Sequence, residues 1–129
     1  MMPGYNTVAG SLPGQNWDGA GSEGTAQAKQ LRAILKKYPQ VLMFNGHSHW
    51  ELNSEKCMYA RDEELPNIFN TAAVGYLWSS YDDIVGSYTE GSNGYVIKVY
   101  KDKVMVLGRD FENGKYVSSA MFVAQNYKK

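Results

Sequence analysis

The chain has 129 residues, 43% of them hydrophobic, and its 13 basic and 13 acidic side chains cancel. This length predicts one domain or part of one, and the absence of a lysine and arginine cluster argues against nucleic acid or an anionic membrane as a partner. No apolar run approaches the ~20 residues of a membrane span, so we expect a soluble chain whose signal peptide, if it has one, lies upstream. The single cysteine, Cys57, excludes an internal disulfide and a cysteine-based zinc cage.

The N-terminal third predicts a loop and then a helix. Residues 1–24 are rich in glycine and proline and show no helix or strand period, which predicts a long loop. From Thr25 the apolar residues recur at the spacing of one helix face, namely Ala28, Leu31, Ile34, Leu35 and Tyr38. We therefore predict an amphipathic helix that Pro39 ends.

A buried strand is predicted next. Residues 41–44 are apolar at every position, which is typical of a parallel strand covered on both faces. A helix followed by such a strand predicts an α/β unit. The sequence "NGHSHW" then falls at the carboxyl edge of the strand, where ligand-binding groups collect in open α/β sheets.

The remainder of the chain predicts mainly β structure. We expect a strand over residues 68–74, an exposed loop over residues 79–93, and a hairpin of residues 95–100 with residues 104–107. The pair Asn113–Gly114 predicts a tight primed turn.

Both histidines of the chain, His47 and His49, stand two residues apart after the predicted strand. On an extended backbone such a pair points to the same side and forms a two-pronged metal clamp. A closed zinc site needs four donors, and the candidates for the remainder are scattered: Asp18, Glu51, Asp82 and Asp83. The alternative is that both histidines are surface loop residues.

Other candidates carry weaker signals. Ser48 lacks the strand–turn–helix elbow of a hydrolase nucleophile, and Trp50 either lines a substrate cleft or packs against the strand. Arg109 and Asp110 favour a local ion pair over catalysis.

Several segments together resemble one family. The run "LRAILKKYPQVLMFNGHSHWELN" resembles the C-terminal signature of calcineurin-like metallophosphoesterases, in which a helix and a buried strand lead to a G-H-x-H motif. The segments "YNTVAGS", "NTAAVGYLW" and "EGSNGYVIKVYKDKVMVLGRDF" resemble the equivalent parts of bacterial members. The likeness covers most of the chain.

The resemblance implies an α/β fold, part of a four-layer α/β/β/α sandwich. It divides the single unit 1–129 into an active-site loop (1–24), a helix, strand and GHSH segment (25–50) and a β-rich remainder (51–129). It implies hydrolysis of phosphomonoesters or phosphodiesters by two divalent or trivalent ions of Mn, Fe or Zn, with His47 and His49 each ligating a different ion. Asn45 and Trp50, which flank the motif, are the weaker candidates for contacts to the substrate or to the ligating histidines.

The sequence also departs from the family pattern. The Asp-x-His, Gly-Asp and Gly-Asn-His motifs have no counterpart, and Met1 and Met2 stand where a further ligand histidine is expected. We therefore expect the C-terminal half of such a domain, without a tight metal pair and inactive in isolation. Its unpaired sheet edge favours a homodimer. The alternative is a noncatalytic α/β binding module or a truncated structural module.

Overall fold

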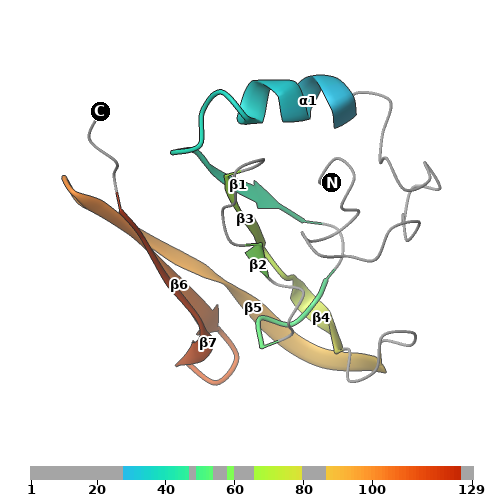
Figure 1. The fold of residues 1–129 in the computed structure, drawn as a ribbon. Helices are drawn as coiled ribbons and strands as arrows, with labels where there is room; N and C mark the ends of the chain where they lie inside the picture. The colour runs from blue at the N-terminus through green and yellow to red at the C-terminus, as the bar shows by residue number, and fades with distance from the viewer. Residues whose placement is uncertain (1–27, 47–48, 54–57, 60–65, 80–86, 126–129) are drawn as a thin grey trace.

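The computed structural model describes residues 28–46, 49–53, 58–59, 66–79 and 87–125. These residues form one short helix, α1 (Ala28–Leu35), and seven strands in two sheets (Figure 1). The described chain is therefore mainly β, and the mixed α/β fold expected from the helix and strand pattern is not confirmed. The predicted loop over residues 1–24 lies outside the described residues.

The first sheet has the order β1-β3-β2. Strand β1 (Leu42–Asn45) runs parallel to β3 (Asn67–Asn70), while β2 (Met58–Tyr59) pairs antiparallel with β3. The parallel pairing predicted for the first strand is present. Its predicted burial on both faces is wrong, because Leu42, Met43 and Phe44 are only half-buried and β1 is an edge strand among the described strands.

Helix α1 is shorter than predicted. It ends at Leu35, four residues before Pro39, and the chain continues in i→i+3 turns in which the Lys37 and Tyr38 amides donate to carbonyls three residues earlier, each at 3.0 Å. Leu35 is buried, whereas Ile34 and Tyr38 of the predicted apolar face are about half exposed. Among the described side chains of the predicted apolar face, only Leu35 is therefore buried.

The second sheet is an antiparallel meander with the order β4-β5-β6-β7. Its strands are β4 (Val74–Ser79), β5 (Ser87–Val99), β6 (Lys103–Asp110) and β7 (Lys115–Gln125). The hairpin predicted around residues 100–103 is confirmed, with Val99 paired to Val104. The loop predicted over residues 79–93 is wrong at both ends, because β4 extends to Ser79 and β5 begins at Ser87; residues 80–86 lie outside the described residues.

The turn between β6 and β7 differs in type from the prediction. Asp110 pairs with Lys115, so four residues form the connection, and within it only Gly114 has a positive φ, of 63°. A primed two-residue turn requires positive φ at its first central residue (type II′) or at both (type I′), and Asn113 has no positive φ, so the prediction for Asn113–Gly114 is wrong. The Asp110 carboxylate instead accepts hydrogen bonds from the Asn113 backbone and side-chain nitrogens at 3.0 and 2.8 Å, and these bonds lower the pKa of Asp110.

The chain passes from the first sheet to the second just after Asn70. The strand predicted over residues 68–74 divides into β3 and β4, because the chain turns at Ala72, whose φ is 57°. Ala72 is buried among core residues of the second sheet. The turn therefore carries the chain from one layer to the next.

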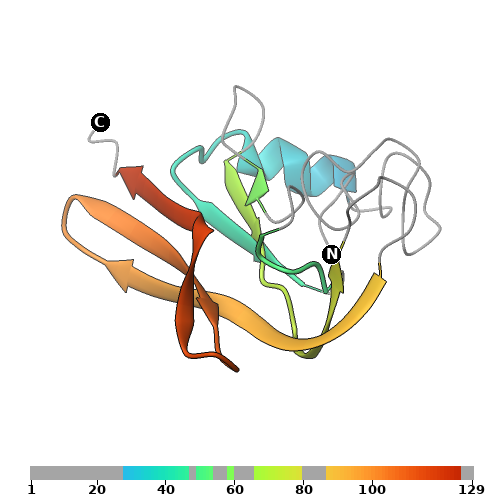
Figure 2. The ribbon, with the colours of Figure 1, turned by 90° about the horizontal axis from the view of Figure 1, so that it is seen from below.

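The core lies between the two sheets. The Phe69 ring of β3 is fully buried and lies 5.2 Å from Phe44, 5.8 Å from Tyr95 and 5.4 Å from Phe122 between ring centroids. Figure 2 shows α1 on the opposite side of the first sheet from β5 and β6. The described elements thus stack as helix, first sheet and second sheet.

Gly108 permits the closest approach in this core, and its replacement is expected to be costly. A Cβ added there would lie 2.6 Å from the Ala120 Cβ and 3.0 Å from the Ala120 carbonyl oxygen. Gly108→Ala is therefore expected to lower the free energy of unfolding by about 1–3 kcal/mol, measured by urea denaturation, through overpacking. Ser118→Ala, at an exposed position of β7, is the control. An unchanged denaturation midpoint for Gly108→Ala would contradict this packing.

Candidate functional site

The carboxyl ends of the parallel strands β1 and β3 bring two asparagines together. Asn45 and Asn70 are register partners, and both side chains are buried. The Asn45 carbonyl accepts hydrogen bonds from the Thr71 amide at 2.8 Å and the Thr71 hydroxyl at 3.1 Å. These bonds fix the point at which the chain leaves β1 and enters the GHSH segment.

The far end of this segment is fixed by β4. The Trp78 amide donates to the His49 carbonyl at 2.8 Å, and the Glu51 amide donates to the Trp78 carbonyl at 3.0 Å. Trp50 forms a parallel bridge with Trp78 and is half-buried. The GHSH segment is therefore held at its start by the first sheet and at its end by the second.

His49 has a left-handed backbone, with φ of 58°. This conformation is uncommon for a residue with a side chain and clusters at functional sites. The expectation that His47 and His49 share one side rested on an extended backbone, and at His49 that premise is wrong. His47 and Ser48 lie outside the described residues.

One nitrogen of the His49 ring has no hydrogen-bond partner among the described groups. Its Nδ1 is buried and forms no hydrogen bond to any described group, and its ring centroid lies 4.3 Å from that of Tyr76. A buried imidazole nitrogen without a partner fits a metal ligand, since metal coordination satisfies the lone pair that water cannot reach. The described residues hold no group of three His, Cys, Asp or Glu side chains that could bind an ion.

Of the other predicted donors, Glu51 alone lies among the described residues. Asp18, Asp82 and Asp83 lie outside the described residues, as does Cys57. Glu51 instead lines a cavity of the second sheet.

Asn70 is a site residue that sequence reasoning missed. Its side chain is fully buried, and in the described chain neither its amide oxygen nor its amide nitrogen has a hydrogen-bond partner. Leaving such a group unsatisfied costs about 1–3 kcal/mol, so a polar partner is expected beside it. The signal was present in the sequence: the runs "LMFN" and "NIFN" each end an apolar strand with asparagine.

The remaining candidate residues from the sequence have different structural roles. Asn45 is buried and holds the segment through its backbone carbonyl. Trp50 pairs with Trp78 of β4 through a parallel bridge, and its role as a cleft residue or a packing residue stays a prediction. Arg109 lies over the Tyr116 ring at 4.8 Å, while its neighbour Asp110 holds the β6–β7 turn.

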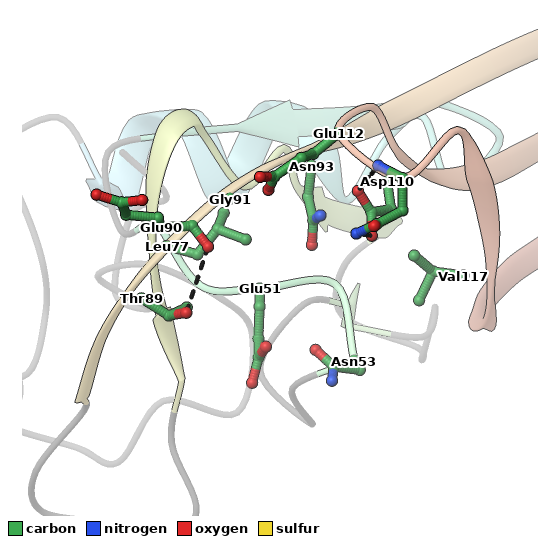
Figure 3. A pocket seen from close by; sticks show the side chains of 11 residues that line it. Glu51, Asn53, Leu77, Thr89, Glu90, Gly91, Asn93, Asp110, Glu112 and Val117 are labelled. Atoms are coloured by element: carbon green, nitrogen blue, oxygen red, sulfur yellow. Dashed lines mark hydrogen bonds between the residues drawn. The ribbon is translucent and has the colours of Figure 1, made fainter.

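A polar cavity of about 230 Å³ opens between the segment after His49 and the second sheet (Figure 3). Its lining includes four carboxylates and three amides: Glu51, Glu90, Asp110, Glu112, Asn53, Asn93 and Asn113. Asn93 is committed to structure, because its Oδ1 accepts a hydrogen bond from the Leu52 amide at 3.2 Å. Figure 3 shows the Glu90 carboxylate pointing away from Glu51 and Asn93, so the cavity does not gather its acids around one point.

Glu51 is expected to make folding stability depend on pH. Partial burial raises the pKa of Glu51, an effect opposed by a hydrogen bond with Asn53. The folded state then holds the proton more tightly than the unfolded state, so stability falls as pH rises from the ordinary glutamate pKa through the raised one. Glu51→Gln is expected to remove this fall, measured as free energy of unfolding between about pH 4 and pH 7. Glu112→Gln is the matched control, and an equal effect in both variants would refute the assignment to Glu51.

Comparisons with protein-family models, with curated proteins and with solved structures find no match to this chain. Among the described residues, no helix has the length and apolar character needed to cross a membrane.

Proposed function

We propose that the chain is the C-terminal part of a calcineurin-like metallophosphoesterase domain and contributes His47 and His49 to a dinuclear metal centre. The observation that carries the proposal is the buried, unpartnered Nδ1 of His49 on a segment pinned at both ends. In the proposed domain, the helix and the two sheets would form part of an α/β/β/α sandwich. The other ligands, carboxylates among them, come from a polypeptide that carries the missing motifs.

The protein groups of this site position the imidazole. Thr71 holds the Asn45 carbonyl and Trp78 holds the His49 carbonyl, so the ring is presented by backbone anchored in both sheets. Such preorganisation lowers the entropic cost of assembling a ligand set. His47 and His49 would each hold one ion of a metal pair, and the pair would supply the nucleophile and stabilise charge on the phosphoryl oxygens.

Reconstitution tests the proposal. A polypeptide bearing the Asp-x-His, Gly-Asp and Gly-Asn-His motifs is added to this chain, and hydrolysis of p-nitrophenyl phosphate is measured with Mn²⁺. Hydrolysis that requires both polypeptides would support the proposal. A stable complex of the two that binds Mn²⁺ without hydrolysing the ester would overturn it and favour a noncatalytic binding module.

A homodimer through a sheet edge remains a prediction. Strand β7 is the terminal strand of the second sheet among the described strands, and residues 116–125 contain no charged side chain. This uncharged stretch of the edge strand offers unpaired backbone groups to a second copy.

A further inference from the structure

Three rings form an aromatic strip that begins at His49 and continues along the second sheet. The strip consists of His49, Tyr76 of β4 and Tyr88 of β5. The His49 and Tyr76 centroids are 4.3 Å apart, and the Tyr76 and Tyr88 rings are stacked at 5.4 Å with an interplanar angle of 26°. The strip therefore connects the candidate metal ligand to a pair of stacked phenol rings.

Sheet register explains the strip. Tyr76 pairs with Glu90 and Trp78 pairs with Tyr88, so Tyr76 and Tyr88 are diagonal neighbours on one face of the sheet. Tyr76 is 38% exposed and Tyr88 is 58% exposed. The rings thus stack on each other while leaving aromatic surface open to solvent next to His49.

We propose that this strip binds the planar ring of the leaving group of a phosphoester, with the phosphate toward His49 and the ring on Tyr88. The inference rests on the proposed function and narrows its substrate class to esters of aromatic or heteroaromatic alcohols and nucleosides. Stacking of a base on an aromatic side chain contributes about 1–3 kcal/mol and tolerates different rings, and offset stacks have centroids 4.5–7 Å apart.

The charges of the chain indicate where the phosphate of this ligand lies, and they disfavour a nucleic-acid polymer as the ligand. Glu90 stands opposite Tyr76 on the same face, so a negative charge is present where a phosphate bound over the tyrosines would lie. The phosphate therefore belongs at the His49 end. A nucleic-acid polymer is disfavoured because the chain has equal numbers of basic and acidic residues and no basic cluster to hold a phosphate backbone.

Ligand titration by NMR tests the strip on the complete 129-residue chain. Adenosine, adenosine monophosphate, phenyl phosphate and ribose 5-phosphate are compared for saturation transfer from protein to ligand protons. The first three are expected to receive saturation at their ring protons, and ribose 5-phosphate is expected to receive much less. Adenosine and phenyl phosphate distinguish a nucleoside from a simple aryl group as the favoured source of the ring.

Substitutions locate the binding. Tyr88→Ala is expected to weaken the Kd for adenosine by at least about fivefold, whereas Tyr88→Phe retains it, because stacking requires the ring and not the hydroxyl. Tyr100→Ala removes a tyrosine of similar exposure, 45%, just after β5 and should leave the Kd unchanged. Far-UV circular dichroism verifies that each variant is folded.

The outcomes separate this inference from the proposed function. Adenosine carries no phosphate, so its binding does not depend on a metal centre. Equal saturation of adenosine and ribose 5-phosphate, or an unchanged Kd in Tyr88→Ala, would overturn the strip as a ring site even where reconstituted hydrolysis succeeds. Binding through Tyr88 without any reconstituted hydrolysis would instead retain the ring site and reject the phosphoesterase.

Discussion

Replacing Phe69 with alanine is expected to lower the free energy of unfolding by about 3–5 kcal/mol, the usual cost of emptying a buried phenylalanine site. Phe69 is fully buried, and its ring contacts the rings of Phe44, Tyr95 and Phe122. Because these contacts come from both sheets, the cavity would open at the junction of the two layers. Urea denaturation followed by circular dichroism measures the loss.

Val99→Ala provides the matched control for that measurement. Val99 is 75% exposed on β5, and surface substitutions of this kind usually change stability by no more than about 0.5 kcal/mol. If Phe69→Ala proved as mild as Val99→Ala, the two sheets would not be joined through Phe69.

His49→Gly is expected to separate ligand function from folding. Glycine adopts the φ of 58° found at His49 without steric cost, so the free energy of unfolding should change by no more than about 1 kcal/mol. In the reconstituted enzyme the same substitution removes a metal ligand. Hydrolysis should fall by more than about 100-fold, since loss of an outer partner of a ligand alone costs about 10–100-fold.

Lys98→Ala, on an exposed residue of β5, controls for nonspecific effects on the assay. A reconstituted His49→Gly enzyme with undiminished hydrolysis would show that His49 is not a ligand. A variant that fails to fold would show instead that packing of the His49 ring on Tyr76 is needed for the fold, and would contradict the small stability change expected.

Local sequence signals predicted the parts of the fold that depend on neighbouring residues. The apolar run before Asn45 predicted β1, and the turn residues between Val99 and Val104 predicted the β5–β6 hairpin. The division between β3 and β4 escaped prediction because Ala72, an ordinary small residue, adopts a left-handed conformation that only its tertiary position explains. Pattern reasoning identifies strands more readily than the places where a strand changes sheets.

The length of β5 escaped prediction for a related reason. Residues 87–92 include two serines, a glycine and a threonine, which are common in loops, yet these residues pair with β4 along its whole length. Cross-strand pairing with Tyr76 and Leu77 overrides the weak local preference. The helix was predicted too long because helical spacing continues to Tyr38 whereas burial ends at Leu35.

The sequence predicted only part of the candidate site. His49 was identified by its motif, and its position after β1 follows from the predicted strand. Asn70 and the tyrosines at positions 76 and 88 meet that region through sheet register, which relates residues far apart in the chain. No spacing rule within one segment could have grouped them.

The most direct measurement for the metal-binding claim is a Mn²⁺ titration of the imidazole resonances by NMR. The chain has two histidines, so the imidazole spectrum contains signals from His47 and His49 alone. Both are expected to broaden at lower Mn²⁺ concentrations than the carboxylates of Glu51 and Asp110 in the polar cavity. Broadening centred on those carboxylates, with both imidazoles unaffected, would contradict the assignment of the histidine pair as metal ligands.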